Sequence, residues 1–200
     1  MSRPPQRRRV PATPLPRRFY RRDPVEVARD VVGAFLIRDL GRMRLVGRVV
    51  EAEAYGEHDP ASHSFRGETP RNRSMFGPPG HAYVYISYGI HHCLNAVADG
   101  PSAVLIRAVE PLEGLDEMAR RRGTREPRLL CAGPGRLCQA FGLDRSNDGL
   151  DLTTGDGLWL ARGKPTGEVL ATARIGFTEA RVRPWRFVER GNRFASRPAR

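Results

Sequence analysis

The chain has 200 residues, of which 40% are hydrophobic, and its 34 Lys and Arg residues outnumber its 22 Asp and Glu residues to give a net charge of +12. This length predicts one domain with a single core, and the charge predicts that the protein binds a polyanion. No apolar run approaches the roughly 20 residues of a membrane span, and no apolar segment marks a signal peptide. We therefore expect a soluble, cytoplasmic protein.

The two ends of the chain differ in composition from the part between them. Residues 1–18 are rich in Pro and Arg and have no periodic apolar face, so we expect a disordered basic arm. Such an arm either adds non-specific affinity for a polyanion or is an inert tail, and the sequence leaves both readings open. The predicted folded domain covers residues 19–193, and a short basic tail, 194–200, follows it.

The first predicted element is a helix. Asp23 supplies an N-cap, Pro24 fits the first helical position, and Glu26 is placed to close a capping box. The apolar spacing then predicts a helix as far as Phe35. Strict alternation predicts a strand over 44–55, and two strands at 81–87 and 91–97 meet in a tight hairpin.

The remaining elements come in runs of one kind. Strands are predicted at 103–109, near 158, at 169–175 and at 185–190, and helices at 112–122 and 134–141. Because strands and helices do not alternate regularly, the pattern favours an α+β fold over a doubly wound one.

Two carboxylates lie on the predicted strand 44–55. Simple alternation places Leu45, Val49, Glu51, Glu53 and Tyr55 on one face. A strand glutamate is usually a solvated charge, but these apolar neighbours indicate partial burial, which suits a general base. Periodicity does not choose between Glu51 and Glu53.

Four of the five tyrosines lie in the same region. Tyr83 and Tyr85 share one face of a strand, where core packing is the default reading; alternatively, Tyr55 and Tyr85 form the two walls of a slot for a flat base. Tyr88 falls at the hairpin tip, where an exposed aromatic is a candidate wedge between base pairs. His63 is either a surface histidine or a hydrogen-bond donor in such a pocket.

No metal or cofactor is predicted. His91, His92 and Cys93 are adjacent on a strand, so neighbouring side chains point to opposite faces, which is poor geometry for a shared ion. Cys131 and Cys138 complete an odd number of cysteines without C-x-x-C spacing. We expect all three cysteines to be small buried hydrophobic residues.

Several segments together resemble the alkyladenine (3-methyladenine) DNA glycosylase family, of the mammalian and bacterial type. They are VVEAEAY (49–55), ASHSFRGETPRNRSMF (61–76), AYVYISYG (82–89), CLN (93–95), LIRAVEPLEG (105–114) and CAGPGRLCQAFGL (131–143). The resemblance covers about residues 25–191. It implies a single α+β domain with a curved antiparallel sheet and a protruding hairpin that enters the DNA minor groove. It also implies a nucleoid-associated repair enzyme, if the source is bacterial.

The resemblance further implies a reaction and the residues that perform it. Alkylated or deaminated purines (3-methyladenine, 7-methylguanine, hypoxanthine and ethenoadenine) would be flipped out of duplex DNA and their N-glycosidic bond hydrolysed. Glu53 would be the general base for a water molecule that Arg107 helps to hold. Tyr55 would stack on one face of the flipped base, and His63 and Tyr85 on the other.

Further positions follow from the same resemblance. Asn95 would lie under the purine edge and disfavour the amino group of guanine, and Tyr88 would fill the gap left in the duplex. His91 stands where relatives often have an aromatic residue, which leaves the shape of the pocket open. The loop that flanks the DNA backbone and the base of the hairpin would contain Arg71, Asn72, Arg73 and Met75.

The lysine content adds an inference about the reaction. Lys164 is the only lysine and lies in a Gly-Lys-Pro-Thr-Gly turn, whereas a glycosylase that also cuts the strand uses an amine to form a Schiff base. We therefore expect a monofunctional enzyme that leaves an intact abasic site. Separately, we expect the protein to be a monomer. The alternatives are a non-catalytic nucleic-acid-binding protein and a hydrolase of free nucleosides. The second alternative would leave Tyr88 and the basic surface without a purpose.

Overall fold

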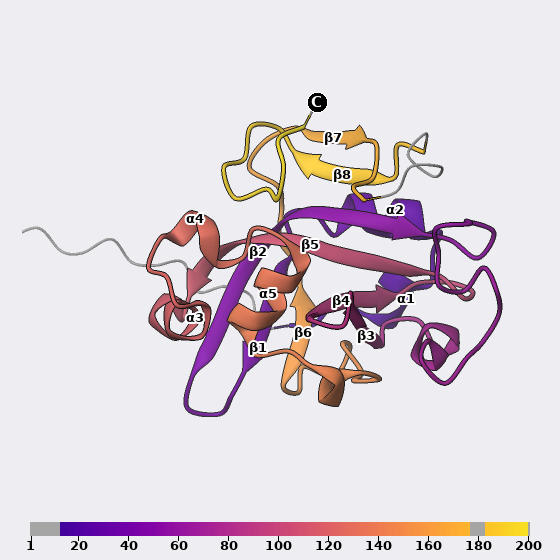
Figure 1. Cartoon of the computed structure of the whole chain (residues 1–200), viewed down its shortest axis with the longest axis horizontal. Helices are drawn as coiled ribbons and strands as arrows, with labels where there is room; N and C mark the ends of the chain where they lie inside the picture. Colours follow the sequence, from indigo (N-terminus) through magenta and orange to yellow (C-terminus); the bar gives the residue numbers. More distant parts are fainter. Residues whose placement is uncertain (1–12, 177–182, 200) are drawn as a thin grey trace, which may run out of the picture.

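A curled antiparallel sheet organises residues 13–176 and 183–199, the part of the chain that the computed structural model describes. The main strand order is β3-β4-β5-β2-β1-β6, and β8 pairs with both β2 and β7. Figure 1 shows the long strands β2 and β5 running side by side across the molecule. The strands are β1 (Phe35–Asp39), β2 (Arg44–Tyr55), β3 (Ala82–Ser87), β4 (His91–Val97), β5 (Ala103–Glu113), β6 (Leu158–Ala161), β7 (Val169–Thr172) and β8 (Arg186–Glu189).

The helices are short and flank the sheet, so the fold is α+β, as predicted. They are α1 (Arg17–Tyr20), α2 (Pro24–Asp30), α3 (Leu115–Arg122), α4 (Pro127–Leu130) and α5 (Pro134–Phe141), with 3-10 turns η1 (Arg73–Phe76) and η2 (Arg145–Asn147). Helix α2 begins as predicted, because the Asp23 side chain accepts a hydrogen bond of 2.8 Å from the Val25 N–H.

The predicted end of α2 was wrong, because the helix ends at Asp30 and Phe35 begins strand β1. Gly33 turns the chain between them with a φ of 93°. A Cβ at this position would lie 2.1 Å from the Pro165 nitrogen, so the turn needs both the left-handed conformation and the small volume of glycine. The next boundary also differs: β5 runs to Glu113 rather than 109, which delays α3 to Leu115.

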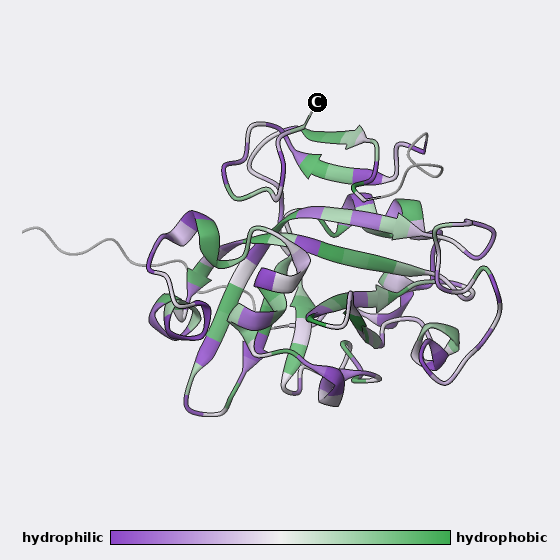
Figure 2. Ribbon diagram, in the orientation of Figure 1, coloured by the Kyte–Doolittle hydropathy of each residue, from purple (hydrophilic) through white to green (hydrophobic). Residues whose placement is uncertain are grey.

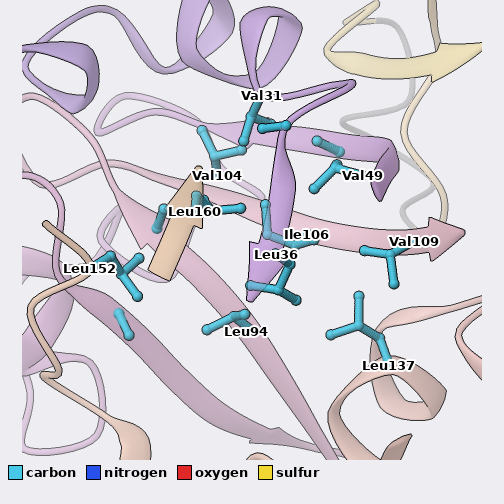
Figure 3. Close-up of a cluster of buried hydrophobic side chains, with 14 of the residues drawn as sticks. Val31, Leu36, Val49, Leu94, Val104, Ile106, Val109, Leu137, Leu152 and Leu160 are labelled. Carbon is cyan, nitrogen blue, oxygen red and sulfur yellow. The ribbon is translucent and has the colours of Figure 1, made fainter. Parts of the chain in front are cut away.

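The main core lies between the sheet and helices α2 and α5. Figure 3 shows Val31 of α2 and Leu137 of α5 gathered with strand residues such as Leu36 and Ile106. Figure 2 shows hydrophobic residues along the strands and hydrophilic residues in many of the connecting loops. Burial of this face leaves the opposite face of the central strands to carry polar groups.

A β-bulge in β2 decides which residues reach that opposite face. The pairing with β5 passes from Val49 opposite Val109 to Glu51 opposite Ala108, with a register shift between them. Leu45 and Val49 therefore pack in the main core, where simple alternation had placed them beside the glutamates. Because of the extra residue in the bulge, the side chains before Glu51 point to the opposite faces from those that simple alternation predicts.

The described parts of the expected arm and of the expected tail pack against the domain, which was not predicted. Residues 1–12 of the expected arm lie outside the described residues, but Leu15 is only 5% exposed and its N–H donates to the Leu160 carbonyl over 2.7 Å. In the expected tail, Phe194 is 6% exposed and Ser196 hydrogen-bonds to Glu51. Among the described helices, none combines the length and the apolar character that crossing a membrane requires.

Candidate active site

Strand register brings distant residues together on the polar face of the sheet. Tyr83 of β3 pairs with Asn95 of β4, Asn95 with Leu105 of β5, and Leu105 with Glu53 of β2. Directly opposite residues on neighbouring strands have Cβ atoms roughly 5 Å apart. The row continues to Arg186 of β8, which pairs with Glu53 from the other side.

Glu53 lies in this row between Leu105 and Arg186 and is fully buried. Its Oε2 accepts hydrogen bonds from the Tyr55 hydroxyl at 2.8 Å and from Arg107 Nη1 at 3.0 Å. Its Oε1 accepts a hydrogen bond of 2.8 Å from the backbone N–H of Ile175. A buried charge needs such partners, and here they approach both carboxylate oxygens.

Glu51, which periodicity did not distinguish from Glu53, accepts more hydrogen bonds than Glu53 does. Its Oε1 accepts hydrogen bonds from Arg107 Nε at 2.9 Å, Arg186 Nε at 2.8 Å and Ser196 Oγ at 2.8 Å. Its Oε2 accepts from the Ser196 N–H at 2.6 Å. Two guanidinium groups and a chain segment therefore converge on Glu51, which makes it a structural centre of the site.

An aromatic pocket opens beside Glu53. Its lining includes Tyr55, His63, Tyr85 and Asn95, together with Met75 and others. The rings of His63 and Tyr85 meet edge to face with centroids 4.5 Å apart. The space inside is about 30 Å³, which is room for about two water molecules, so a larger flat ring would enter with some movement of these side chains.

Asn95 faces this pocket in a fixed orientation. It is only 3% exposed, and its Nδ2 donates to the Tyr83 carbonyl over 3.0 Å. The amide nitrogen is thus held by the backbone.

Local electrostatics set the proton positions around the pocket. Burial, and then the charge of Glu53, raise the pKa of Tyr55 well above 10, so its hydroxyl keeps the proton that it donates to Glu53. His63 is exposed as a residue, but its ring packs on Tyr83 and Tyr85; partial burial of the ring, and then the charge of Arg71, lower the pKa of His63 below 6.5. The ring is therefore neutral at pH 7.

The hairpin between β3 and β4 presents Tyr88 to solvent. Tyr88 is 89% exposed and adopts a left-handed φ of 50°, followed by Gly89 at 72°. The Ile90 N–H closes the turn on the Ser87 carbonyl over 3.1 Å, and Ile90 is itself 73% exposed. An aromatic side chain that makes few contacts here and adopts an unfavourable backbone conformation is not explained by packing.

The loop after β2 divides into exposed and buried side chains. Arg71 and Arg73 are exposed, as contact with a DNA backbone requires. Asn72 is 4% exposed and instead donates to the His63 and Gly67 carbonyls at 2.8 and 3.0 Å, and Met75 is 2% exposed in the pocket wall. The expected backbone contact therefore does not fit these two side chains, which shape the loop and pocket instead.

Other predicted groups lie apart from this site or are buried as expected. Cys93, Cys131 and Cys138 are all buried free thiols. No cluster of His, Cys, Asp and Glu able to hold a metal ion occurs in residues 13–176 and 183–199. Lys164 is exposed in the connection between β6 and β7.

Sequence reasoning missed the residues that hold the site together. Arg186 and Ser196 bind Glu51, and a buried pair, Asp59 and Arg174, lies behind Tyr55. None of these belongs to a periodic pattern that would mark it as buried. A signal is present only for the two arginines, as charge beside apolar residues: Arg174 precedes Ile175, and Arg186 precedes Phe187 and Val188.

Taken together, the features define a pocket for a flat ring with a buried carboxylate beside it, on a strongly basic protein. The family model described as "Methylpurine-DNA glycosylase (MPG)" matches residues 18–193. The chain therefore belongs to the methylpurine-DNA glycosylase family. It is a DNA glycosylase, an enzyme of base-excision repair, and its substrate is DNA. This family membership decides against the two alternative classes.

Individual relatives match over almost the whole chain. Proteins from Carboxydothermus hydrogenoformans, Nitrobacter winogradskyi and Rhizobium meliloti are 44%, 48% and 51% identical to it. The alignments cover 92%, 94% and 90% of this chain and 98%, 89% and 94% of the relatives, respectively. Each of the three is named "Putative 3-methyladenine DNA glycosylase".

Proposed function

We propose that the protein excises alkylated and deaminated purines from duplex DNA, with Glu53 as the general base. One observation carries this proposal: Glu53 is fully buried, yet Tyr55 and Arg107 hold its Oε2 beside the aromatic pocket. The names of the relatives point to the same class of substrate, a methylated adenine. A carboxylate in this position can take a proton from a water molecule that Arg107 helps to hold.

The reaction follows from the chemistry of the residues around the pocket. The flipped base stacks between Tyr55 on one face and His63 and Tyr85 on the other. Water attacks C1′ while the bond from C1′ to the purine nitrogen breaks, the purine leaves with the bonding electrons, and Glu53 receives the proton of the water. The negative charge of Glu53 also stabilises the positive charge that develops on the sugar.

The aromatic walls favour one class of base in particular. A purine methylated at N3 or N7 carries a positive charge, which cation–π attraction to the tyrosine rings stabilises, and it leaves as a neutral molecule. A deaminated purine is neutral and needs a proton when it leaves. Asn95, with its amide held on the Tyr83 carbonyl, restricts the purine edge and disfavours the amino group of guanine.

The remaining roles concern the duplex and the outcome of the reaction. Tyr88 fills the gap that the flipped nucleotide leaves, and Arg71 and Arg73 contact phosphates. The single lysine, Lys164, is outside the residues that line the pocket, so no lysine is available there for a Schiff base. The protein acts as a monomer and leaves an intact abasic site.

A direct test uses a labelled duplex that carries a single hypoxanthine or ethenoadenine. The wild type and Glu53→Gln are compared, with alkali added afterwards to cut abasic sites. Glu110→Gln is the matched control, because Glu110 is a partly buried carboxylate on the same sheet that pairs with Arg48. We expect alkali-dependent cleavage with the wild type and the control, and DNA binding without cleavage with Glu53→Gln.

Two results would contradict the proposal. Base release by Glu53→Gln at the wild-type rate would remove Glu53 as the base. Strand cleavage by the wild type before the addition of alkali would contradict the monofunctional reaction.

A further inference from the structure

The backbone donor to Glu53 comes from a segment outside the paired strands. Strand β7 ends at Thr172, and the N–H of Ile175, three residues later, reaches Glu53 Oε1 over 2.8 Å. This hydrogen bond holds one oxygen of the carboxylate, while Arg107 and Tyr55 hold the other. The orientation of Glu53 therefore depends on where residues 173–176 are placed.

A buried ion pair determines that placement. Arg174 directly precedes the donor, and its side chain and that of Asp59 are both fully buried. The two groups pair in a bidentate manner: Arg174 Nη2 lies 3.0 Å from Asp59 Oδ1, and Nη1 bonds to Oδ2. Arg174 Nη1 also donates to the Ala54 carbonyl over 2.8 Å. The guanidinium thus joins residues 173–176 to the end of β2 and to the loop that follows it.

The same guanidinium supports the pocket wall. It lies over the ring of Tyr55 at 4.7 Å from the centroid and over Trp185 at 5.4 Å. Tyr55 in turn donates its hydroxyl to Glu53. Two of the three groups that hold Glu53 therefore depend on Arg174 for their position, although Arg174 is itself 2% exposed and is not among the residues that line the pocket.

Stability alone does not account for such a pair. Removing two charges from water costs several kcal/mol, and well-packed apolar residues often replace a buried pair without loss. What apolar residues lack is the fixed, planar geometry of a bidentate guanidinium. That geometry is useful where the position of the next backbone N–H matters.

We propose that Arg174 and Asp59 are positioning residues for base excision, which orient Glu53 through the Ile175 N–H and Tyr55 through ring stacking. The inference rests on the proposed role of Glu53. Neither residue touches the substrate, so binding of DNA does not depend on them. Small errors in the placement of a reacting group reduce rates by about 100-fold, and the effect falls on the chemical step.

The test compares Arg174→Met, Arg174→Lys and Asp59→Asn with the wild type. Single-turnover release of hypoxanthine from a duplex, at saturating enzyme, reports the chemical step; affinity is measured for a duplex with a tetrahydrofuran abasic analogue. Arg48→Met is the matched control, because Arg48 is a buried arginine of β2 that pairs with Glu189 and Glu110. Thermal unfolding of every variant gives its loss of stability.

We expect Arg174→Met and Asp59→Asn to release the base about 10- to 100-fold more slowly, with affinity for the abasic analogue unchanged within about threefold. Arg174→Lys, which retains the charge without the planar fork, should recover part of the rate. It also provides the test if Arg174→Met does not fold. Arg48→Met should lose stability but keep the wild-type rate.

Two outcomes overturn the inference alone: wild-type rates in all three variants, or a rate loss no larger than that of Arg48→Met. Glu53→Gln, run in parallel, separates this failure from failure of the proposed function. If Glu53→Gln is inactive while the Arg174 variants retain the wild-type rate, the role of Glu53 as general base is supported and its positioning by Arg174 is refuted. If Glu53→Gln is active, both proposals fail.

Discussion

Replacing Tyr88 separates a role in DNA from a role in folding, because its side chain has little part in the packed structure. It is 89% exposed and its backbone adopts a φ of 50°. Tyr88→Gly removes the ring and allows the left-handed turn without strain. Tyr88→Phe keeps the ring and removes only the hydroxyl.

The expected effects on stability and on activity have opposite signs. Relief of the left-handed conformation stabilises by about 1–2 kcal/mol, and the flexibility of glycine in the unfolded chain costs about 0.5–1 kcal/mol. The melting temperature of Tyr88→Gly should therefore be unchanged or rise by a few degrees. Loss of a ring that stacks on bases costs about 1–3 kcal/mol, which corresponds to roughly 5- to 160-fold slower base release.

The assay is release of a single hypoxanthine from a duplex, with enzyme below saturation so that the cost of flipping is included. Leu40→Ser serves as a control, since Leu40 is a partly exposed apolar residue in the turn between β1 and β2. Tyr88→Phe and Leu40→Ser should both retain the wild-type rate. A wild-type rate for Tyr88→Gly, or a melting temperature lowered by more than about 5 °C, would refute the reasoning.

Three further predictions concern buried charge, pH and salt. Glu51→Gln should lower stability by about 3–5 kcal/mol, since it leaves two buried guanidinium groups poorly paired; an unchanged urea midpoint would contradict this. The pKa of His63, measured by NMR, should lie below 6.5, so that its contribution to stability is complete above pH 6.5 and is lost as the pH falls. Arg71→Ala should raise the pKa of His63, because it removes a nearby positive charge. Arg71→Ala should also reduce the salt dependence of DNA binding by about one ion, while Arg190→Ala, which removes a surface partner of Glu168, should not.

Elements with strong local signals were predictable from the sequence. Asp23 and Pro24 predict the start of α2, and the alternating side-chain pattern of residues 44–55 predicts β2. The hairpin at Tyr88 was likewise recognisable, because two alternating runs separated by a short turn with glycine are typical of a β-hairpin. In each case the information lies within a few residues of the feature.

Features that depend on distant contacts were not predictable. The end of α2 at Asp30 depends on Gly33 meeting residues 164 and 165, far along the chain. The bulge that reverses the faces of β2 has no signature in the alternation, which continues through it. For the same reason, the pattern alone could not choose between Glu51 and Glu53, whereas their hydrogen-bond partners distinguish them.

The positive and negative charges buried around the site are equal in number. Three carboxylates and three guanidinium groups are at most 8% exposed: Glu51, Glu53, Asp59, Arg107, Arg174 and Arg186. Arg107 links Glu51 to Glu53, and its pKa is raised, because the pull of these two carboxylates exceeds the opposing effect of burial. Guanidinium groups stay charged at any pH at which the protein is folded, whereas a buried lysine can lose its proton. Arg107 therefore keeps its charge as the pH changes, whereas the protonation of His63 changes as the pH falls below 6.5, so a pH dependence of base release includes this pocket residue.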